Sequence, residues 1–319
     1  MTTSVPMQSA PDAQDVPGAQ NIREGVLEIP GEIRLYFGAA LNNVRVGWRL
    51  QGPVAAPVIA AFGGISADRR VLTGLPGESG WWQDVLGSAQ ALGAHAVRVL
   101  SFDWLGGSGA TSGPAPGAEF PPVSTYDQAE LLLRLLNHLG IKALHAIVGA
   151  SYGGMVALAF AERYPERVAR VGVVSASDRT HPMATAWRCV QRRIIRLAWR
   201  HGAADEGLEL ARALAMATYR SPEEFAARFA GSPRLDAAGH HVFPVEEYLL
   251  ARGAEYARRH QAGSFLCLSE SIDLHRVDAG RIFTPVLALA VREDQLVPLT
   301  DMRAMAARLP RGKLFEISS

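Results

Sequence analysis

Apolar residues along this chain follow two patterns, short continuous runs and longer segments with helical spacing. Each run has the length of a strand and is bounded by turn residues, which predicts strands buried on both faces. Between the runs, apolar residues at helical spacing predict amphipathic helices. Strand and helix in alternation indicate a parallel sheet with right-handed crossovers. The predicted strands are residues 58–62, 97–102, 144–148 and 168–174, and the helices are residues 81–92 and 125–139.

The start and the later part of the chain differ from this alternation. Residues 26–29, 33–37 and 44–50 alternate or run apolar between turn residues, which predicts antiparallel opening strands. From residue 182 to residue 275 only helical segments are expected, so a helical insertion interrupts the α/β core. The expected elements are residues 187–199, 207–218, 222–229 and 245–260 in the insertion, then 285–291, 300–309 and 313–317 in the resumed core.

These patterns divide the chain into a tail, a core in two parts and an insertion. Residues 1–24 are rich in Ala, Pro, Gln, Ser and Asp, as expected of a disordered N-terminal tail. The core is expected at residues 25–181 and 277–319, with residues 182–276 as a helical lid. The predicted fold class is therefore α/β, a mostly parallel sheet flanked by helices.

Composition excludes several classes of partner. The net charge is +1, with 48% apolar and 20% charged residues, so nothing in the charge balance favours nucleic acid or an anionic membrane. Cys189 and Cys267 fit reduced thiols of a cytoplasmic protein, and no metal-ligand spacing involves them. No signal-peptide pattern opens the chain, and no apolar run reaches membrane-spanning length.

The motif Gly149-Ala150-Ser151-Tyr152-Gly153 joins a predicted buried strand to a predicted helix. So tight a turn forces Ser151 into a strained backbone conformation, and the two glycines remove Cβ atoms that would clash. The serine hydroxyl then lies at the carboxyl edge of the sheet, beside a helix N-terminus that favours an oxyanion. This placement predicts a nucleophilic serine rather than an incidental one.

The residues around this motif carry a family resemblance. The chain resembles the α/β-hydrolase-fold homoserine O-acyltransferases of methionine biosynthesis, from about Tyr36 to its end. Ordinary esterases share the serine turn but not this set of motifs. The matching pieces are Gly80-Trp81-Trp82, Leu105-Gly106-Gly107, Thr111-Ser112-Gly113-Pro114, Phe120-Pro121, Leu139-Gly140-Ile141, Gly149–Met155, Tyr164–Val168, Gln191-Arg192, Thr218–Ser221, Glu247-Tyr248-Leu249 and Glu293–Pro298.

The chain also departs from the family pattern. Tyr152 follows the nucleophile where the family usually has Met, and Gly63-Gly64-Ile65-Ser66-Ala67 replaces a His-Ala-Leu-Thr-Gly sequence. Residues 261–266 differ from the family's Asp-Ala-Asn-Ser-Tyr-Leu. These departures bear on the acyl donor more than on the fold.

The resemblance implies a Ser-acid-His triad in that chain order. Asp294 occupies the position of the acid, with Glu293 as the alternative. No histidine follows His275, which the resemblance makes a structural residue. We therefore expect the histidine base beyond Ser319, on the loop after the last strand; the alternative is an inactive or rewired relative.

Oxyanion stabilisation needs two N–H donors, for which we expect the backbone of Tyr152 and of Ile65. The resemblance places Arg192 at the homoserine carboxylate, a group that favours bidentate arginine, and Tyr219 in the same cleft. Arg69 and Arg70 follow the predicted oxyanion loop and could hold a succinyl carboxylate.

The sequence therefore predicts a cytoplasmic acyltransferase that forms an acyl-Ser151 intermediate from acyl-CoA and passes it to L-homoserine. Succinyl is slightly favoured over acetyl. No cofactor or metal is expected, and the resemblance implies a homodimer. The alternatives are a serine esterase of the same fold, a serine O-acyltransferase and a binding protein without activity.

Overall fold

The structure is a computed structural model that describes residues 14–15, 21–74, 76–87 and 97–318. Within these residues, nine strands form one sheet in the order β1-β2-β3-β5-β4-β6-β7-β10-β11. The strands are β1 (Gln14–Asp15), β2 (Ile22–Arg34), β3 (Ala40–Gln51), β4 (Val58–Phe62), β5 (Arg98–Phe102), β6 (Ala146–Ala150), β7 (Val171–Val174), β10 (Val286–Val291) and β11 (Gly312–Ile317).

The sheet is antiparallel where the chain begins and parallel over the rest, as the sequence predicts. Strand β2 pairs with β3, and β3 with β5, in antiparallel register. From β5 to β11 every neighbouring pair is parallel. Strand β2 begins at Ile22, inside the range expected to be a tail, and covers the first predicted opening strand, with an irregularity between Ile29 and Glu32. It ends at Arg34, so most of the strand predicted at residues 33–37 is not part of it. Residues 1–13 and 16–20 of that tail lie outside the described residues.

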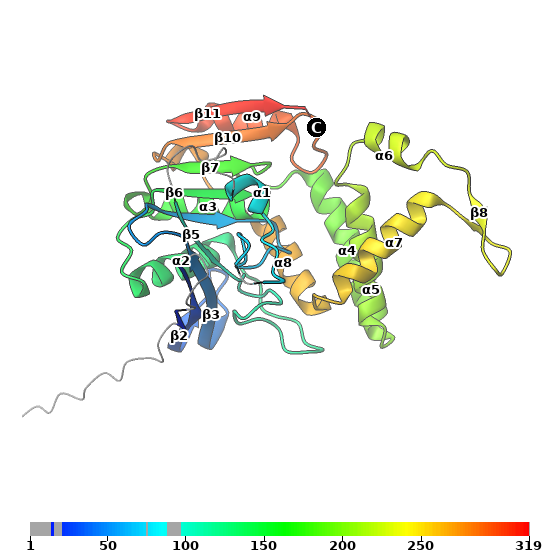
Figure 1. The fold of residues 1–319 in the computed structure, drawn as a ribbon, viewed down its shortest axis with the longest axis horizontal. Helices are drawn as coiled ribbons and strands as arrows, with labels where there is room; N and C mark the ends of the chain where they lie inside the picture. The colour runs from blue at the N-terminus through cyan, green and yellow to red at the C-terminus, as the bar shows by residue number, and fades with distance from the viewer. Residues whose placement is uncertain (1–13, 16–20, 75, 88–96, 319) are drawn as a thin grey trace, which may run out of the picture.

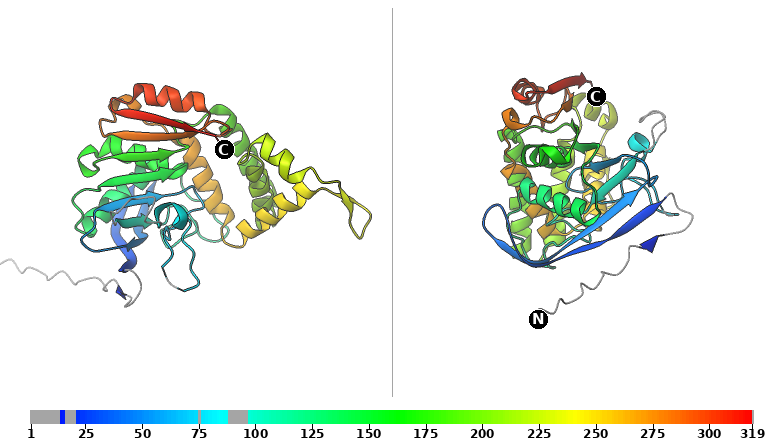
Figure 2. Two further views of the ribbon diagram at one scale, coloured as in Figure 1. Left: turned by 45° about the horizontal axis from the view of Figure 1, so that its top comes forward. Right: turned by 90° about the vertical axis from the view of Figure 1, so that its left-hand side faces the viewer.

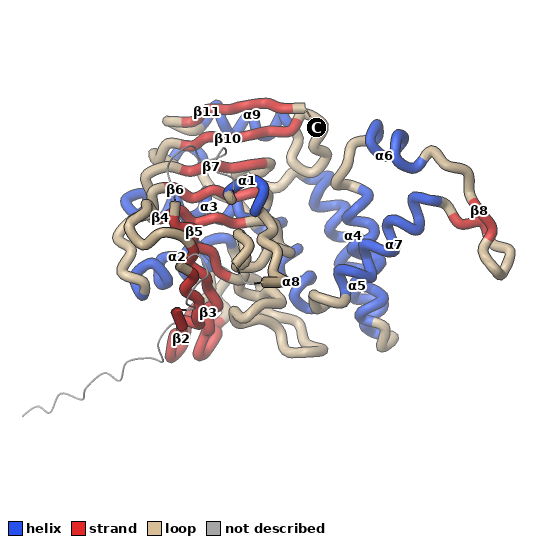
Figure 3. The backbone as a smooth tube through the Cα atoms, in the orientation of Figure 1, coloured by secondary structure: helices blue, strands red, loops and turns tan. Residues whose placement is uncertain are grey.

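Helices cover both faces of the sheet (Figure 3). The most central is α3 (Tyr152–Arg163), whose residues from Tyr152 to Ala161 are all buried. The helix α2 (Thr125–His138) packs against it through a leucine face and begins at a capping box formed by Ser124 and Asp127. The others are α1 (Gln83–Leu86) and α9 (Leu299–Arg308), with 3₁₀ turns at Pro165–Arg167 and Ala279–Arg281; the rest of the helix expected at 81–92 falls largely outside the described residues.

The insertion forms a separate helical lid beside the carboxyl ends of the parallel strands (Figures 1 and 2). Its own apolar core includes Ile195, Leu208, Tyr256 and Phe265. This core holds the helices of the insertion to one another, while Cys267 and Leu268 of the last of them pack in the main core with the sheet. The lid helices are α4 (Pro182–Arg200), α5 (Ala204–Ala217), α6 (Pro222–Phe229), α7 (Pro244–Ala257) and α8 (Ala262–Leu274).

Two features of the insertion correct the prediction of helical segments alone. A two-stranded hairpin, β8 (Arg234–Leu235) with β9 (His241–Val242), joins α6 to α7. Helix α8 was not predicted, because nine of its residues are buried and the segment has no amphipathic spacing to detect. Across the described ranges, no helix has both the length and the apolar character that a bilayer crossing requires.

Candidate active site

Ser151 lies in the sharp turn between β6 and α3. Its backbone has φ 53° and ψ −119°, a conformation that a residue with a side chain rarely adopts. A Cβ atom at Gly149 would lie 2.2 Å from the Gly153 carbonyl oxygen, and one at Gly153 would lie 2.5 Å from that of Phe62. The strain and the need for both glycines are therefore confirmed, and the turn leaves Ser151 exposed.

Two backbone N–H groups beside Ser151 are available to a ligand. In the described part of the chain, the N–H groups of Tyr152 and Ile65 make no hydrogen bond, although Gly153 N–H donates to the Gly63 carbonyl at 2.9 Å. That bond ties the loop after β4 to the first turn of α3. Unpaired N–H donors are what an oxyanion site requires, so Tyr152 and Ile65 remain its candidates.

The Tyr152 side chain points into the core, away from the serine. Its hydroxyl lies 2.7 Å from Ser271 Oγ and accepts a hydrogen bond from Gln128 Nε2 at 3.3 Å. The ring meets Trp104 edge-on, with centroids 5.0 Å apart. Burial raises the pKa of Tyr152, so the hydroxyl stays protonated. The Tyr152 side chain thus anchors the first turn of α3 to α2 and α8.

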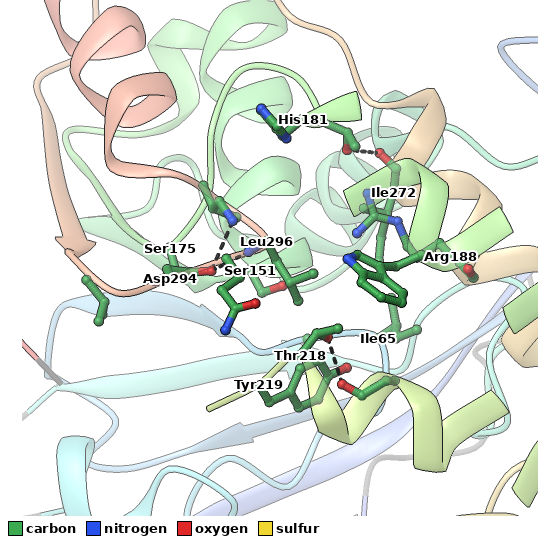
Figure 4. Close-up of a pocket in the computed structure, with 18 of the residues that line it drawn as sticks. Ile65, Ser151, Ser175, His181, Arg188, Thr218, Tyr219, Ile272, Asp294 and Leu296 are labelled. Carbon is green, nitrogen blue, oxygen red and sulfur yellow. Dashed lines mark hydrogen bonds between the residues drawn. The ribbon is translucent and has the colours of Figure 1, made fainter. Parts of the chain in front are cut away.

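Ser151 opens into a cavity of about 480 Å³ between the sheet and the lid (Figure 4). Its walls come from the loop after β4, from α4, from the α5–α6 connection, from α8 and from the loop after β10. A cavity of this size accommodates a small substrate or an acyl arm. The predicted site residues in its lining are Ser151, Ile65, Tyr219 and Asp294.

Asp294 follows β10 and shares the cavity with Ser151 (Figure 4). Its Oδ1 accepts hydrogen bonds from the N–H groups of Leu296 at 2.9 Å and Val297 at 3.0 Å. Among the described residues, Oδ2 has no partner, so this oxygen is available to an imidazole. Glu293 also lines the cavity and keeps its place as the alternative acid.

Arg192 is not part of the cavity lining, which departs from the predicted contact with the acceptor. Its Nη1 donates to Asp273 at 2.7 Å and to the Ser269 carbonyl and hydroxyl oxygens at 3.0 Å each. Arg188, one helical turn earlier, lines the cavity instead and pairs with the same carboxylate. The sequence spacing could not separate these arginines, because both lie on the buried face of α4.

Because Arg192 also pairs with Asp273, Arg188 carries charge that this carboxylate does not fully balance. Its Nε donates to Asp273 Oδ1 at 2.8 Å. Its Nη2 lies 2.7 Å from the same oxygen as an ion pair, but it is off the direction of a hydrogen bond and has no partner in the described residues. Two guanidinium groups on one carboxylate leave an excess of positive charge at the cavity wall, which favours an anionic ligand.

Arg69 and Arg70 do not reach the cavity, which removes the predicted reason for a succinyl donor. Arg69 pairs with buried Asp103 at 2.6 Å. Arg70 pairs with Asp68 and Glu78, each at 3.1 Å. Both side chains stabilise the loop before α1 rather than face Ser151.

The described histidines near the site are engaged elsewhere. His275 is 2% exposed; its Nε2–H donates to the Ser177 carbonyl at 3.2 Å, and its Nδ1 accepts from the Thr125 hydroxyl at 2.8 Å. Burial lowers the pKa of His275 to about 4. His181, which was not expected at the site, lines the cavity, but its Nδ1 accepts from the Met183 N–H and caps α4. In neither arrangement does a nitrogen lone pair face Ser151.

Comparison with known proteins agrees with this geometry. Residues 71–319 match the family model described as the alpha/beta hydrolase fold. A homoserine O-succinyltransferase of Xanthomonas campestris pv. campestris is 41% identical over 86% of this chain and 73% of its own length. The chain belongs to the α/β-hydrolase-fold homoserine O-acyltransferases. A homoserine O-acetyltransferase of Thermus thermophilus is 35% identical over 76% of this chain and 67% of its own length.

Solved structures share the fold beyond this acyltransferase family. A homoserine O-acetyltransferase from Staphylococcus aureus superposes with a TM-score of 0.79 at 22% identity, over 93% of this chain and 88% of that one. The esterase E22 superposes with a TM-score of 0.81 at 20% identity, over 93% and 94%. The fold alone therefore does not separate transferases from esterases.

Proposed function

We propose that this protein transfers an acyl group from acyl-CoA to the hydroxyl of L-homoserine through an acyl-Ser151 intermediate, a step of methionine biosynthesis. The observation that carries the proposal is the cavity that joins the strained Ser151 to the acid loop of Asp294, in a chain whose 41% and 35% identical relatives are named homoserine acyltransferases. A relative named serine O-succinyltransferase, 29% identical over 89% of this chain, makes L-serine the alternative acceptor.

In the first half-reaction, Ser151 Oγ attacks the thioester carbonyl carbon and its proton passes to a histidine held by Asp294. The negative charge that develops on the carbonyl oxygen is stabilised by the N–H groups of Tyr152 and Ile65. The C–S bond then breaks, the imidazolium protonates the departing thiolate, and the acyl group remains on Ser151 as an ester.

In the second half-reaction, the homoserine hydroxyl attacks the acyl-Ser151 carbonyl and gives its proton to the same histidine. Collapse of the tetrahedral intermediate returns that proton to Ser151 Oγ and releases the O-acyl amino acid. The prediction that this histidine follows β11 stays a prediction, and so do a cytoplasmic location and a homodimer.

The arginines in the cavity lining favour substrates that carry carboxylate groups. Arg188 shares the carboxylate of Asp273 with Arg192, which leaves positive charge at the cavity wall, and Arg220 also lines the cavity at the α5–α6 connection. We assign the acyl carboxylate of a succinyl donor and the carboxylate of the amino acid to these two cations, in place of Arg69, Arg70 and Arg192. Asp301, also in the lining, is the candidate partner of the ammonium group.

The second candidate is an esterase, favoured by the superposition with esterase E22. The apolar side chains of Trp187 and Phe265 in the cavity lining would favour transfer if substrate binding excludes water from the acyl-enzyme. Partition of the acyl-enzyme between homoserine and water separates the two reactions.

The test is to incubate the full chain with succinyl-CoA or acetyl-CoA, with and without L-homoserine, and to follow the peptides by mass spectrometry. We expect one acyl mass on the peptide with Ser151 without acceptor, and O-acylhomoserine when the acceptor is added. Release of free acid at the same rate in both samples would identify an esterase instead.

A further inference from the structure

A second cavity of about 450 Å³ lies in the lid, between α5, α6 and α7. In Figure 1, α7 runs across the lid beside α5, and α6 lies above it. The cavity differs from the one at Ser151 in its charge, because arginine dominates its lining. The five arginines are Arg212, Arg220, Arg228, Arg252 and Arg259.

The carboxylates around these arginines do not balance them. Glu255 pairs with Arg252 at 2.6 Å and with Arg259 at 3.1 Å. Glu224 pairs with Arg220 and with Arg228, the latter at 3.5 Å. Arg212 has no carboxylate partner among the described residues. Two carboxylates against five guanidinium groups leave an excess of positive charge, which attracts an anion.

Tyrosine rings also contact four of these guanidinium groups, and Arg212 has such a contact without a carboxylate partner among the described residues. Arg228 lies 5.2 Å from the centre of the Tyr248 ring, and Arg220 and Arg252 lie 5.8 and 5.9 Å from it. Arg212 lies 4.7 Å from the centre of the Tyr256 ring. Contact with an aromatic face orders a guanidinium but does not consume its N–H donors, which suits an arginine that must bind phosphate.

The arginine cavity adjoins the cavity of Ser151. Arg220 lines both, and its carbonyl accepts a hydrogen bond from Gln295 of the acid loop at 3.3 Å. Arg212 donates to the hydroxyl of Tyr219 at 3.1 Å, and Tyr219 lines the cavity of Ser151. The two cavities are therefore neighbours that share the α5–α6 connection as a wall.

We propose that this arginine cavity binds the phosphate groups of the acyl donor's nucleotide. The inference rests on the proposed function, which makes the donor a CoA thioester. Such a donor carries its thioester at one end of a pantetheine arm and a diphosphate and a 3′-phosphate at the other. Arginine is the preferred partner of phosphate, since its planar fork bonds two oxygens at once.

Another basic cavity provides a matched control. It is lined by Arg193, Arg196 and Arg200 on α4 and has Glu119 beside them, with Arg196 bonded to both Glu119 oxygens. It shares no lining residue with the cavity of Ser151. Removal of an arginine from this cavity tests whether a general loss of positive potential is enough to weaken binding of the acyl donor.

The first experiment compares two donors, acyl-CoA and acyl-pantetheine, which lacks the phosphates. In Arg228→Ala and Arg252→Ala, whose side chains are 44% and 51% exposed, we expect the lid to fold. The KM for acyl-CoA should rise on the order of tenfold for each arginine, as for loss of a charged hydrogen bond. In these two variants the KM for acyl-pantetheine should change less than twofold. In the control variants Arg193→Ala and Arg200→Ala, the KM for acyl-CoA should also change less than twofold. An equal rise with both donors, or in the control variants, would overturn the proposal.

The second experiment does not depend on turnover. Adenosine 3′,5′-bisphosphate is titrated into the full chain by calorimetry, and we expect binding that weakens on the order of tenfold in Arg228→Ala and in Arg252→Ala. If neither donor supports transfer while this pattern holds, the acyltransferase function fails and the phosphate site stands. If transfer occurs but the bisphosphate binds wild type and Arg228→Ala equally, the phosphate site fails and the function stands.

Discussion

The serine turn and the lid hold functional side chains by different means. At the turn, backbone geometry does the work: Ser151 is strained, its flanking glycines have no room for a Cβ atom, and α3 is buried over ten consecutive residues. In the lid, ion pairs and aromatic rings hold arginines at the cavity walls. The difference teaches that the serine turn depends on backbone geometry, whereas the cavity walls in the lid depend on side-chain pairs that single substitutions can change.

The largest expected effect is at the turn. Ser151→Ala removes the nucleophile, so acyl transfer should fall by on the order of 10⁴ or more, with no acyl adduct on the protein. The melting temperature should stay close to that of the wild type, since Ser151 is exposed and the substitution keeps the small side chain. Substantial transfer by this variant would show that the core does not supply the nucleophile.

The next effect separates buried from exposed ion pairs in the lid. Asp273 is 9% exposed and bonds Arg188 and Arg192. Asp273→Ala leaves both cations buried without a partner, and we expect a loss of about 3–5 kcal/mol in the free energy of unfolding. The control is Glu119→Gln, whose pair with Arg196 is about half exposed and should contribute about 0–1 kcal/mol. If urea denaturation measured the same loss of unfolding free energy in both variants, the buried pairs would be no more stabilising than the exposed one.

The core should also respond to pH through His275. Burial lowers its pKa to about 4, whereas an unfolded histidine titrates near 6.5. The unfolded chain therefore binds the additional proton between these values. The stability that the neutral imidazole provides is complete above about pH 6.5 and is lost as the pH falls toward 4, by up to about 3 kcal/mol.

Urea denaturation at pH 7.0 and 4.5 measures this pH dependence. His240→Gln, which changes an exposed histidine of the lid, should keep the wild-type difference between the two pH values. His275→Gln should reduce it. A pH dependence that is the same in all three proteins would mean that His275 is not its source.

The smallest expected effect is at the anchor behind the oxyanion site. Tyr152→Phe removes the hydroxyl that contacts Ser271 and Gln128 in the core, which should cost about 1–2 kcal/mol of stability. If the anchor also holds the Tyr152 N–H in position, kcat should fall several-fold while KM for acyl-CoA is little changed. Ser271→Ala, which leaves the same hydroxyl with one partner fewer, should produce a smaller change of the same kind.

Local patterns predicted most of the core and part of the lid. Buried strands, leucine spacing and the glycines around Ser151 are determined by near neighbours in the chain, and each was found where expected. Helix α8 was missed because burial on all sides removes the amphipathic signal. The hairpin β8–β9 was missed because its strands are two residues long and largely exposed.

By itself, then, the sequence determined the α/β alternation, the strained serine and the loop of Asp294, because each depends on backbone preferences that neighbouring residues set. Only the tertiary structure decided which arginine lines the cavity. Arg188 and Arg192 share Asp273 from successive turns of one helix, and Arg69 and Arg70 bond carboxylates far along the chain or on their own loop. A long flexible cation goes to whichever carboxylate the fold brings near, and that choice is made by packing rather than by sequence spacing.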